Sequence, residues 1–235
     1  MSPVVLLSGW GCDARLWEPL AGYWPARLEV STPDWPGHGG RPALADPERL
    51  ADLADAMAAD LPPEAIWVGW SLGGLLATAL LGHLPTPRGL VLLGMGARFC
   101  HPDGVTEEAL ATFQTAFRRD PEATRSHFLR WQLRGEPSPR AAHHRLLGLI
   151  GRGPCAPRAT LAAGLHQLAH LDHRHHLAAP PCPIWRVAGE HDPLLATSAR
   201  DEADIRLADA GHCPMVSQPE ALAACLVEIA GEGSP

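Results

Sequence analysis

One serine stands between two glycines in the stretch GWSLGG, residues 69–74. Ser71 follows the apolar run 65–68, whose Ile, Trp and Val favour a strand, and precedes the run 72–81, whose Leu and Ala favour a helix. A tight strand-to-helix turn strains its central residue and crowds the positions two before and two after it, so Gly69 and Gly73 suit those positions. The turn would present the Ser71 hydroxyl as a nucleophile beside the backbone N–H groups of a helix N-terminus.

A serine nucleophile needs an imidazole to take its proton and a carboxylate to orient that imidazole. Asp192 comes just after the apolar run 183–189, and His212 comes just after the run 203–209. Asp209 is another candidate acid, although it stands only three residues before His212, and His191 is another candidate base, although it precedes the acid. We expect Ser71, Asp192 and His212 to form the catalytic set.

The negative charge that develops in such a reaction requires two backbone donors. One is the N–H of Leu72, at the start of the helix after Ser71. The other is the N–H of Trp10, because LLSGWGCDARLW, residues 6–17, reads as a strand, a glycine-rich loop and a helix. The indoles of Trp10 and Trp70 could form a wall of an acyl pocket.

Short apolar runs alternate with helical patterns along much of the chain, which indicates a mostly parallel sheet with helices on both faces. We expect helices near 14–23, from 47 to about 60, after Ser71 and from about 219 to 229. The expected strands are residues 4–7, 28–31, 65–68, 90–93, 183–189 and 203–209.

Residues 98–178 read instead as an insertion of four helical segments separated by Pro and Gly, at 106–119, 121–134, 138–150 and 158–171. We predict a helical lid at 98–178 and a core of residues 1–97 and 179–235. All nineteen basic residues are arginines, and eleven of them lie in the lid against seven acids, so the lid carries about +4 and the core about −11.

The composition fits a single α/β domain with an insertion, at 235 residues and 25.1 kDa. Apolar runs stay short of membrane-spanning length, and six scattered cysteines suit a reducing compartment, so we expect a cytoplasmic protein. We expect no metal, cofactor, nucleic acid or membrane to take part. The alternative of a zinc protein rests on HQLAHLDHRHH, residues 166–176, where His166 and His170 are one helical turn apart.

Five stretches resemble, in order, the α/β-hydrolase esterases of biotin synthesis, the pimeloyl-acyl-carrier-protein methyl ester esterases: GWGCDARLW, DWPGHGG, AIWVGWSLGG, GEHDPLL and AGHCPMVSQP. In the lid, HFLRWQLRG is similar to the substrate-contacting helix of that family. The resemblance implies an α/β-hydrolase fold and the catalytic roles given above. It also implies that the substrate is bound by Trp10, Ser71, Leu72, His212 and the lid residues Phe128, Leu129, Arg130, Trp131 and Gln132.

The chain departs from the family pattern in three places. It begins at what should be the third strand, so we expect an N-terminally shortened sheet. Ser8 stands where the superfamily usually has His before the oxyanion glycine. Ala123 and His127 occupy lid positions that are basic in the family, whereas Arg140 matches.

The resemblance implies a serine carboxylesterase that hydrolyses the methyl ester of pimeloyl-acyl carrier protein, with that carrier as partner, and we expect a monomer. The acidic carrier would dock on Arg130, Arg134, Arg140 and Arg145, on or beside the helix that carries Phe128 and Gln132. The alternatives are another esterase or thioesterase of this fold, a lyase of menaquinone synthesis, and a non-catalytic binding module that kept the fold.

Overall fold

A computed structural model describes residues 1–232, and its centre is one six-stranded sheet in the order β2-β1-β3-β4-β5-β6. The strands are β1 (Val4–Leu7), β2 (Val30–Ser31), β3 (Ile66–Trp70), β4 (Gly89–Leu93), β5 (Ile184–Gly189) and β6 (Ile205–Leu207). All five pairings are parallel, for example Leu7 with Gly69 and Trp70 with Leu93. The expected mostly parallel sheet is therefore confirmed, and its edges are the two-residue strand β2 and the three-residue strand β6.

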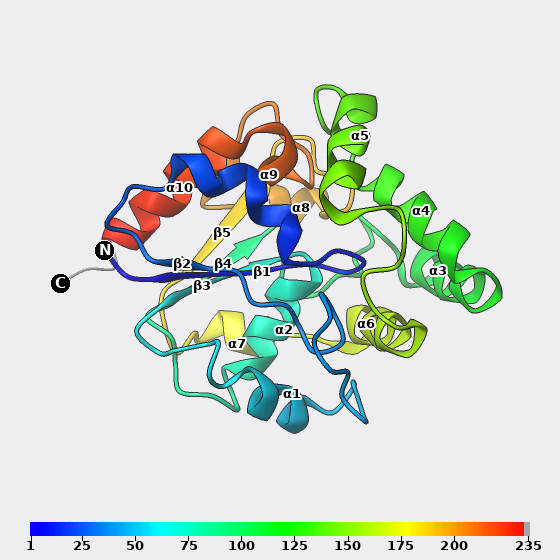
Figure 1. The fold of residues 1–235 in the computed structure, drawn as a ribbon, viewed down its shortest axis with the longest axis horizontal. Helices are drawn as coiled ribbons and strands as arrows, with labels where there is room; N and C mark the ends of the chain where they lie inside the picture. The colour runs from blue at the N-terminus through cyan, green and yellow to red at the C-terminus, as the bar shows by residue number, and fades with distance from the viewer. Residues whose placement is uncertain (233–235) are drawn as a thin grey trace.

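Helices cover both faces of this sheet (Figure 1). One face carries α1 (Leu50–Met57), α2 (Leu72–Leu80) and α7 (Arg174–Ala178), and the other carries η1 (Ala14–Tyr23), α9 (Pro214–Ser217) and α10 (Pro219–Glu232). Side chains alternate between the two apolar cores: Val5 and Leu7 join the first, whereas Val4 and Leu6 join the second. A further short helix, α8 (Thr197–Asp201), follows β5.

Four helices from the middle of the chain form one group beyond one end of the sheet (Figure 1, green to yellow-green). They are α3 (Glu107–Arg119), α4 (Pro121–Trp131), α5 (Pro139–Ile150) and α6 (Arg158–His170). A side-chain cap begins each of the first two: the Thr106 hydroxyl accepts from Ala109 N–H at 3.2 Å, and the Asp120 carboxylate, between α3 and α4, accepts from Ala123 N–H at 2.9 Å. Their bounds agree closely with the four expected segments, and we call α3–α6 the lid.

The expected helix at 14–23 has a 3₁₀ conformation. Pro19 lies inside it and lacks the N–H that a continuous α-helix would use there. Other elements are shorter than expected: α1 begins at Leu50 rather than residue 47, and β2 spans only two residues. Within residues 1–232, no helix has the length and apolar character needed to cross a membrane.

Candidate active site

Ser71 lies on the turn between β3 and α2 with φ of +56° and ψ of −126°. A positive φ is costly for a residue with a side chain, so the turn is strained at the residue that the sequence singled out. Glycine relieves the crowding on both sides. A Cβ on Gly69 would lie 2.5 Å from the Cα of Gly74, and a Cβ on Gly73 would lie 2.7 Å from the carbonyl oxygens of Leu7 and Ser8.

Asp192 and His212 meet at the same end of the sheet. Asp192 follows β5, His212 follows β6, and Nδ1 of His212 lies 2.7 Å from Oδ2 of Asp192, with both side chains fully buried. The other carboxylate oxygen of Asp192 accepts the N–H groups of Leu194 and Leu195, at 2.8 and 3.1 Å. The carboxylate is thereby held in one orientation, as a residue that orients an imidazole must be.

Contacts of Trp70, Leu93 and Gly94 bring Ser71 and His212 to the same end of the sheet. Trp70, the residue before Ser71, donates from Nε1 to the His212 carbonyl at 2.7 Å, and its ring lies 5.3 Å from the imidazole. The Ser71 N–H donates to the carbonyl of Leu93 at 2.9 Å. The next residue, Gly94, lies so close that a Cβ there would be 3.1 Å from both Nδ1 of His212 and Oδ2 of Asp192.

The remaining ring nitrogen of His212, Nε2, is buried and has no hydrogen-bond partner among residues 1–232. It is therefore available to accept a proton. The other candidates are placed differently: Asp209 and His191 are both exposed, and the Asp209 carbonyl accepts a bond from Gln218. The structure thus pairs His212 with Asp192 rather than with Asp209.

The glycine-rich loop after β1 forms a tight turn that contains Trp10. The Cys12 N–H donates to the Gly9 carbonyl at 3.3 Å, and Gly11 has φ of +77°, which is typical of the third residue of a type II turn. The Trp10 N–H has no acceptor within the described chain. Leu72 is the first residue of α2, so its N–H has no acceptor inside the helix. Both expected backbone donors are therefore available to a ligand.

The Trp10 side chain joins this turn to the lid. Its Nε1 donates to the carbonyl of Leu161 in α6 at 2.8 Å. Its ring packs edge-on against Phe113, Phe117 and Phe128, with ring centroids 5.7, 5.7 and 5.0 Å apart. An apolar aromatic cluster therefore lies directly beside the proposed oxyanion donors.

Helix α4 presents its expected substrate-contacting residues in two directions. Phe128, Leu129 and Gln132 are buried, and the Gln132 amide lies beside the buried Cys12 thiol. Arg130 is exposed and bonds the Ser126 hydroxyl, whereas Trp131 is half-buried against Phe128. Phe128 shares an apolar core with Trp10, and Trp131 packs against that core, whereas Leu129 joins the core on the other side of the sheet.

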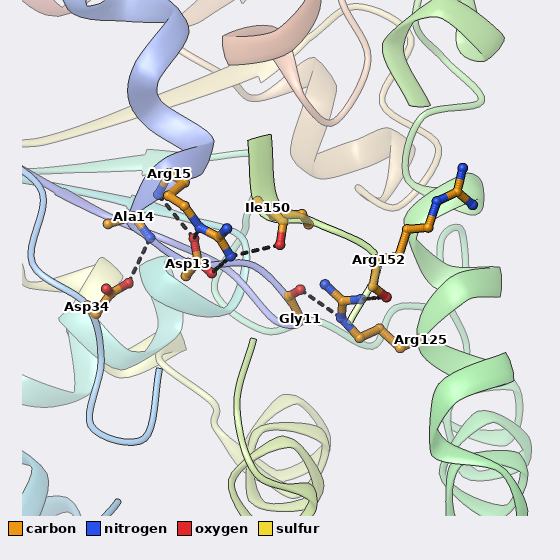
Figure 2. Close-up of polar contacts among 8 residues, drawn as sticks. All are labelled: Gly11, Asp13, Ala14, Arg15, Asp34, Arg125, Ile150 and Arg152. Carbon is orange, nitrogen blue, oxygen red and sulfur yellow. Dashed lines mark hydrogen bonds and ion pairs between the residues drawn. The ribbon is translucent and has the colours of Figure 1, made fainter. Parts of the chain in front are cut away.

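Figure 2 shows polar contacts that fasten the Trp10 turn to the lid and that the sequence did not predict. Arg125, on α4 and 4% exposed, donates from Nε to the Gly11 carbonyl at 3.1 Å and from Nη1 to the Arg152 carbonyl at 3.3 Å. Arg15 binds the buried carboxylate of Asp13 and donates to the carbonyl of Ile150, the last residue of α5. The Arg125–Gly11 and Arg15–Ile150 bonds join residues 114 and 135 positions apart in the sequence, so no local pattern indicates them.

The three candidate catalytic residues are closed off from solvent: Ser71, Asp192 and His212 are 1–2% exposed. A cavity of about 40 Å³, lined in part by Ser8, Trp10, His38 and Leu72, lies beside the oxyanion donors. Ser8, which replaces the usual histidine, contributes its carbonyl to Nε1 of Trp35 at 2.8 Å. Burial lowers the pKa of His38, so its imidazole is held neutral. The Ser71 turn is therefore shielded from bulk solvent in this structure.

All six cysteines are free thiols, and those nearest the site are buried or half-buried. Burial raises the pKa of Cys12 and Cys213 well above the ordinary value and that of Cys155 to about 11, so the thiolate form is suppressed. His166 and His170 stack on each other at 3.9 Å. Across residues 1–232, no group of three or more His, Cys, Asp or Glu side chains is arranged to hold a metal ion.

A family model described as the alpha/beta hydrolase family matches residues 4–225. The pimeloyl-[acyl-carrier protein] methyl ester esterase of Aromatoleum aromaticum is 35% identical, over 96% of this chain and 97% of its own length. The chain belongs to the alpha/beta hydrolase family and, within it, to the family of these esterases. The predicted resemblance is thereby confirmed. The protein of the same name from Edwardsiella ictaluri is 32% identical, over 97% of this chain and 92% of its own length.

Solved structures support the fold. An esterase from Exiguobacterium antarcticum superposes with a TM-score of 0.80 at 17% identity, covering 98% of this chain and 92% of its own. An esterase from Thermogutta terrifontis superposes with a TM-score of 0.77 at 21% identity, covering 100% and 91%. At these identities the likeness concerns the fold, which confirms the predicted α/β-hydrolase architecture.

Proposed function

We propose that this chain is a serine carboxylesterase that hydrolyses the methyl ester of pimeloyl-acyl carrier protein, releasing methanol and the free carboxylate for biotin synthesis. The observation that carries the chemistry is the buried Asp192–His212 pair, at 2.7 Å, beside the strained Ser71 turn. The substrate comes from the relatives, which bear that activity in their names and match the chain over nearly its full length.

In the proposed mechanism, Nε2 of His212 takes the proton from the Ser71 hydroxyl as its oxygen attacks the ester carbonyl. The resulting oxyanion accepts the N–H groups of Trp10 and Leu72. When the tetrahedral intermediate collapses, His212 gives its proton to the departing methanol and Ser71 retains the acyl group. Water, activated by His212, then attacks this acyl-enzyme and releases the free acid, and Ser71 regains its proton.

The aromatic cluster suits the apolar part of such a substrate. Phe128 contacts Trp10 on one side and Trp131 on the other, and Trp131 also borders a surface groove between α3 and α4 of about 900 Å³. An acyl chain that passed from this groove along Phe128 would reach the oxyanion donors through apolar surroundings. Gln132, the buried residue that ends α4 beside Cys12, is the proposed polar contact for the substrate.

The proposed docking surface for the acidic carrier is made of Arg130, Arg134, Arg140 and Arg145, all exposed. Arg134 and Arg119 line the α3–α4 groove, so basic side chains are present there although Ala123 and His127 are not basic. The lid charge of about +4 would attract such a carrier to the end of the molecule nearest Ser71. The six free thiols suit a reducing compartment, so we propose that the enzyme is cytoplasmic.

A substrate panel tests the proposal. The purified chain is offered methyl esters of pimeloyl, shorter and longer dicarboxylic acyl chains on acyl carrier protein, the matching thioesters, and free p-nitrophenyl esters. We expect the highest kcat/KM for methyl pimeloyl-acyl carrier protein, with methanol as product. Preference for a thioester would indicate a thioesterase, and inertness toward every ester would contradict the enzymatic proposal.

A further inference from the structure

Glu136 reaches from the lid to the loop that carries His212. It lies between α4 and α5, is 4% exposed, and accepts the N–H of Gly211 at 2.9 Å on Oε2 and the N–H of Cys213 at 2.7 Å on Oε1. The Ser217 hydroxyl also donates to Oε2. One lid carboxylate therefore binds the backbone immediately before and immediately after His212.

Glycines allow this close approach. A Cβ on Gly211 would lie 2.7 Å from Oε1 of Glu136 and 2.8 Å from the carbonyl carbon of Gly135. A Cβ on Gly135 would overlap the carbonyl oxygen of His191, which lies in the Asp192 loop. Backbone thus packs against backbone where the lid meets the loops of both catalytic residues, so a shift of one loop is transmitted directly to the other.

The carboxylate is compensated by hydrogen bonds alone, because no Arg, Lys or His of the described chain lies within ion-pair distance of it. A buried charge in this situation is tolerated only while its hydrogen bonds are kept. The Glu136 bonds therefore favour one conformation of the His212 backbone strongly. An apolar side chain at position 136 has no acceptor for these N–H groups and would not select that conformation.

The other polar groups of His212 are also engaged. Its carbonyl accepts from Trp70, and Nδ1 binds Asp192 at 2.7 Å, which leaves Nε2 as the free atom. We propose that Glu136 is a positioning residue: by holding the N–H groups on both sides of His212, it aligns Nε2 with the Ser71 hydroxyl. The proposal rests on the catalytic roles proposed above for Ser71 and His212.

Hydrolysis of p-nitrophenyl butyrate, a small ester that needs no carrier docking, tests this role. Glu136→Gln keeps the size of the side chain, but its NH₂ group cannot accept, so one of the two flanking N–H groups loses its partner. We expect kcat to fall about 100-fold while KM stays within about twofold, because a misplacement of roughly 1 Å has this effect on a proton transfer. Circular dichroism establishes that the variant is folded at the assay temperature.

Ser217→Ala is the matched control, because it removes the third hydrogen bond of Glu136 and keeps both flanking His212. Its kcat should stay within about twofold of wild type. An equal loss in both variants, or a wild-type kcat in folded Glu136→Gln, overturns the proposal. If Glu136→Gln does not fold, Glu136→Asp withdraws the carboxylate by one methylene, and a wild-type kcat in that variant has the same meaning.

Ser71→Ala, assayed alongside, separates the two levels of argument. If Ser71→Ala is inactive and Glu136→Gln has a wild-type kcat, only the positioning role fails. If Ser71→Ala retains activity, the proposed catalytic set itself fails.

Discussion

Ser71 combines a backbone conformation that few residues with a side chain adopt with burial of 98%. Strain of this kind persists where the surrounding structure enforces it, and here Gly69 and Gly73 supply the space. Ser71→Ala should keep the fold, since alanine has the same backbone demands and a smaller side chain. We expect ester hydrolysis to fall about a thousandfold or more. The measurement is kcat with p-nitrophenyl butyrate, and wild-type turnover would refute the role of the serine.

Single substitutions also distinguish Asp192 from Asp209 as the carboxylate that orients His212. Asp192→Asn should lower kcat by roughly 10⁴-fold, because an amide on Nδ1 of His212 favours the wrong tautomer. Asp209→Asn should leave both kcat and thermal stability nearly unchanged, because Asp209 is exposed and its φ of +52° suits asparagine. A severe loss of kcat in Asp209→Asn would transfer the acid role to Asp209.

The double variant His212→Ala, Asp192→Asn should have the same kcat as His212→Ala alone, since both residues act in one proton transfer.

At the scale of elements, the lid helices fix the loop that carries Trp10. Arg125 binds the carbonyls of Gly11 and Arg152, and no carboxylate of the described chain lies within ion-pair distance of its guanidinium (Figure 2). In Arg125→Met, two carbonyls lose a donor, at about 1–3 kcal/mol each, but the desolvation cost of a buried charge, several kcal/mol, is relieved. The effects oppose each other, so the free energy of unfolding should change by no more than about 2 kcal/mol.

Turnover should respond more strongly than stability, because the Trp10 turn loses a hydrogen bond that fixes its orientation. We expect kcat of Arg125→Met on p-nitrophenyl butyrate to fall about tenfold. Arg118→Met is the control: Arg118 is an exposed lid arginine whose side chain bonds the Thr115 hydroxyl, within its own helix. Urea unfolding gives the stability, and equal kcat values for the two variants would show that the Arg125 contacts do not serve the reaction.

The elements were predictable from sequence to different degrees. The lid helices follow from caps and prolines that act locally, such as Asp120 and Pro121, and the order Ser71, Asp192, His212 follows from loops after strands. The roles of Arg125 and Glu136 depend on partners 114 and 75–77 residues away. No local pattern distinguishes these residues from the other charges of the lid, so only the packing of lid on core shows them. The 3₁₀ form of η1 was missed although Pro19 was visible in the sequence.

At the scale of the whole molecule, the positive charge of the lid lies at the same end of the sheet as Ser71. The lid helices carry about +4 and the rest of the chain about −11, and Ser71 is buried. An acidic carrier would be drawn to the lid and kept from the core. The double variant Arg130→Glu, Arg134→Glu should therefore raise KM for methyl pimeloyl-acyl carrier protein roughly tenfold and weaken its dependence on salt.

The same variant should hydrolyse p-nitrophenyl butyrate with nearly the wild-type kcat and KM, because an uncharged small ester is not attracted by the positive charge of the lid. Arg27→Glu, Arg206→Glu is the matched control: both residues are exposed on the core, and the change in net charge is identical. If the fall in carrier affinity reflects overall charge, the two double variants will have equal KM values for the carrier ester across a series of salt concentrations. If the lid is the docking surface, only the lid variant will lose affinity, and the loss will shrink as salt screens the attraction in the wild type.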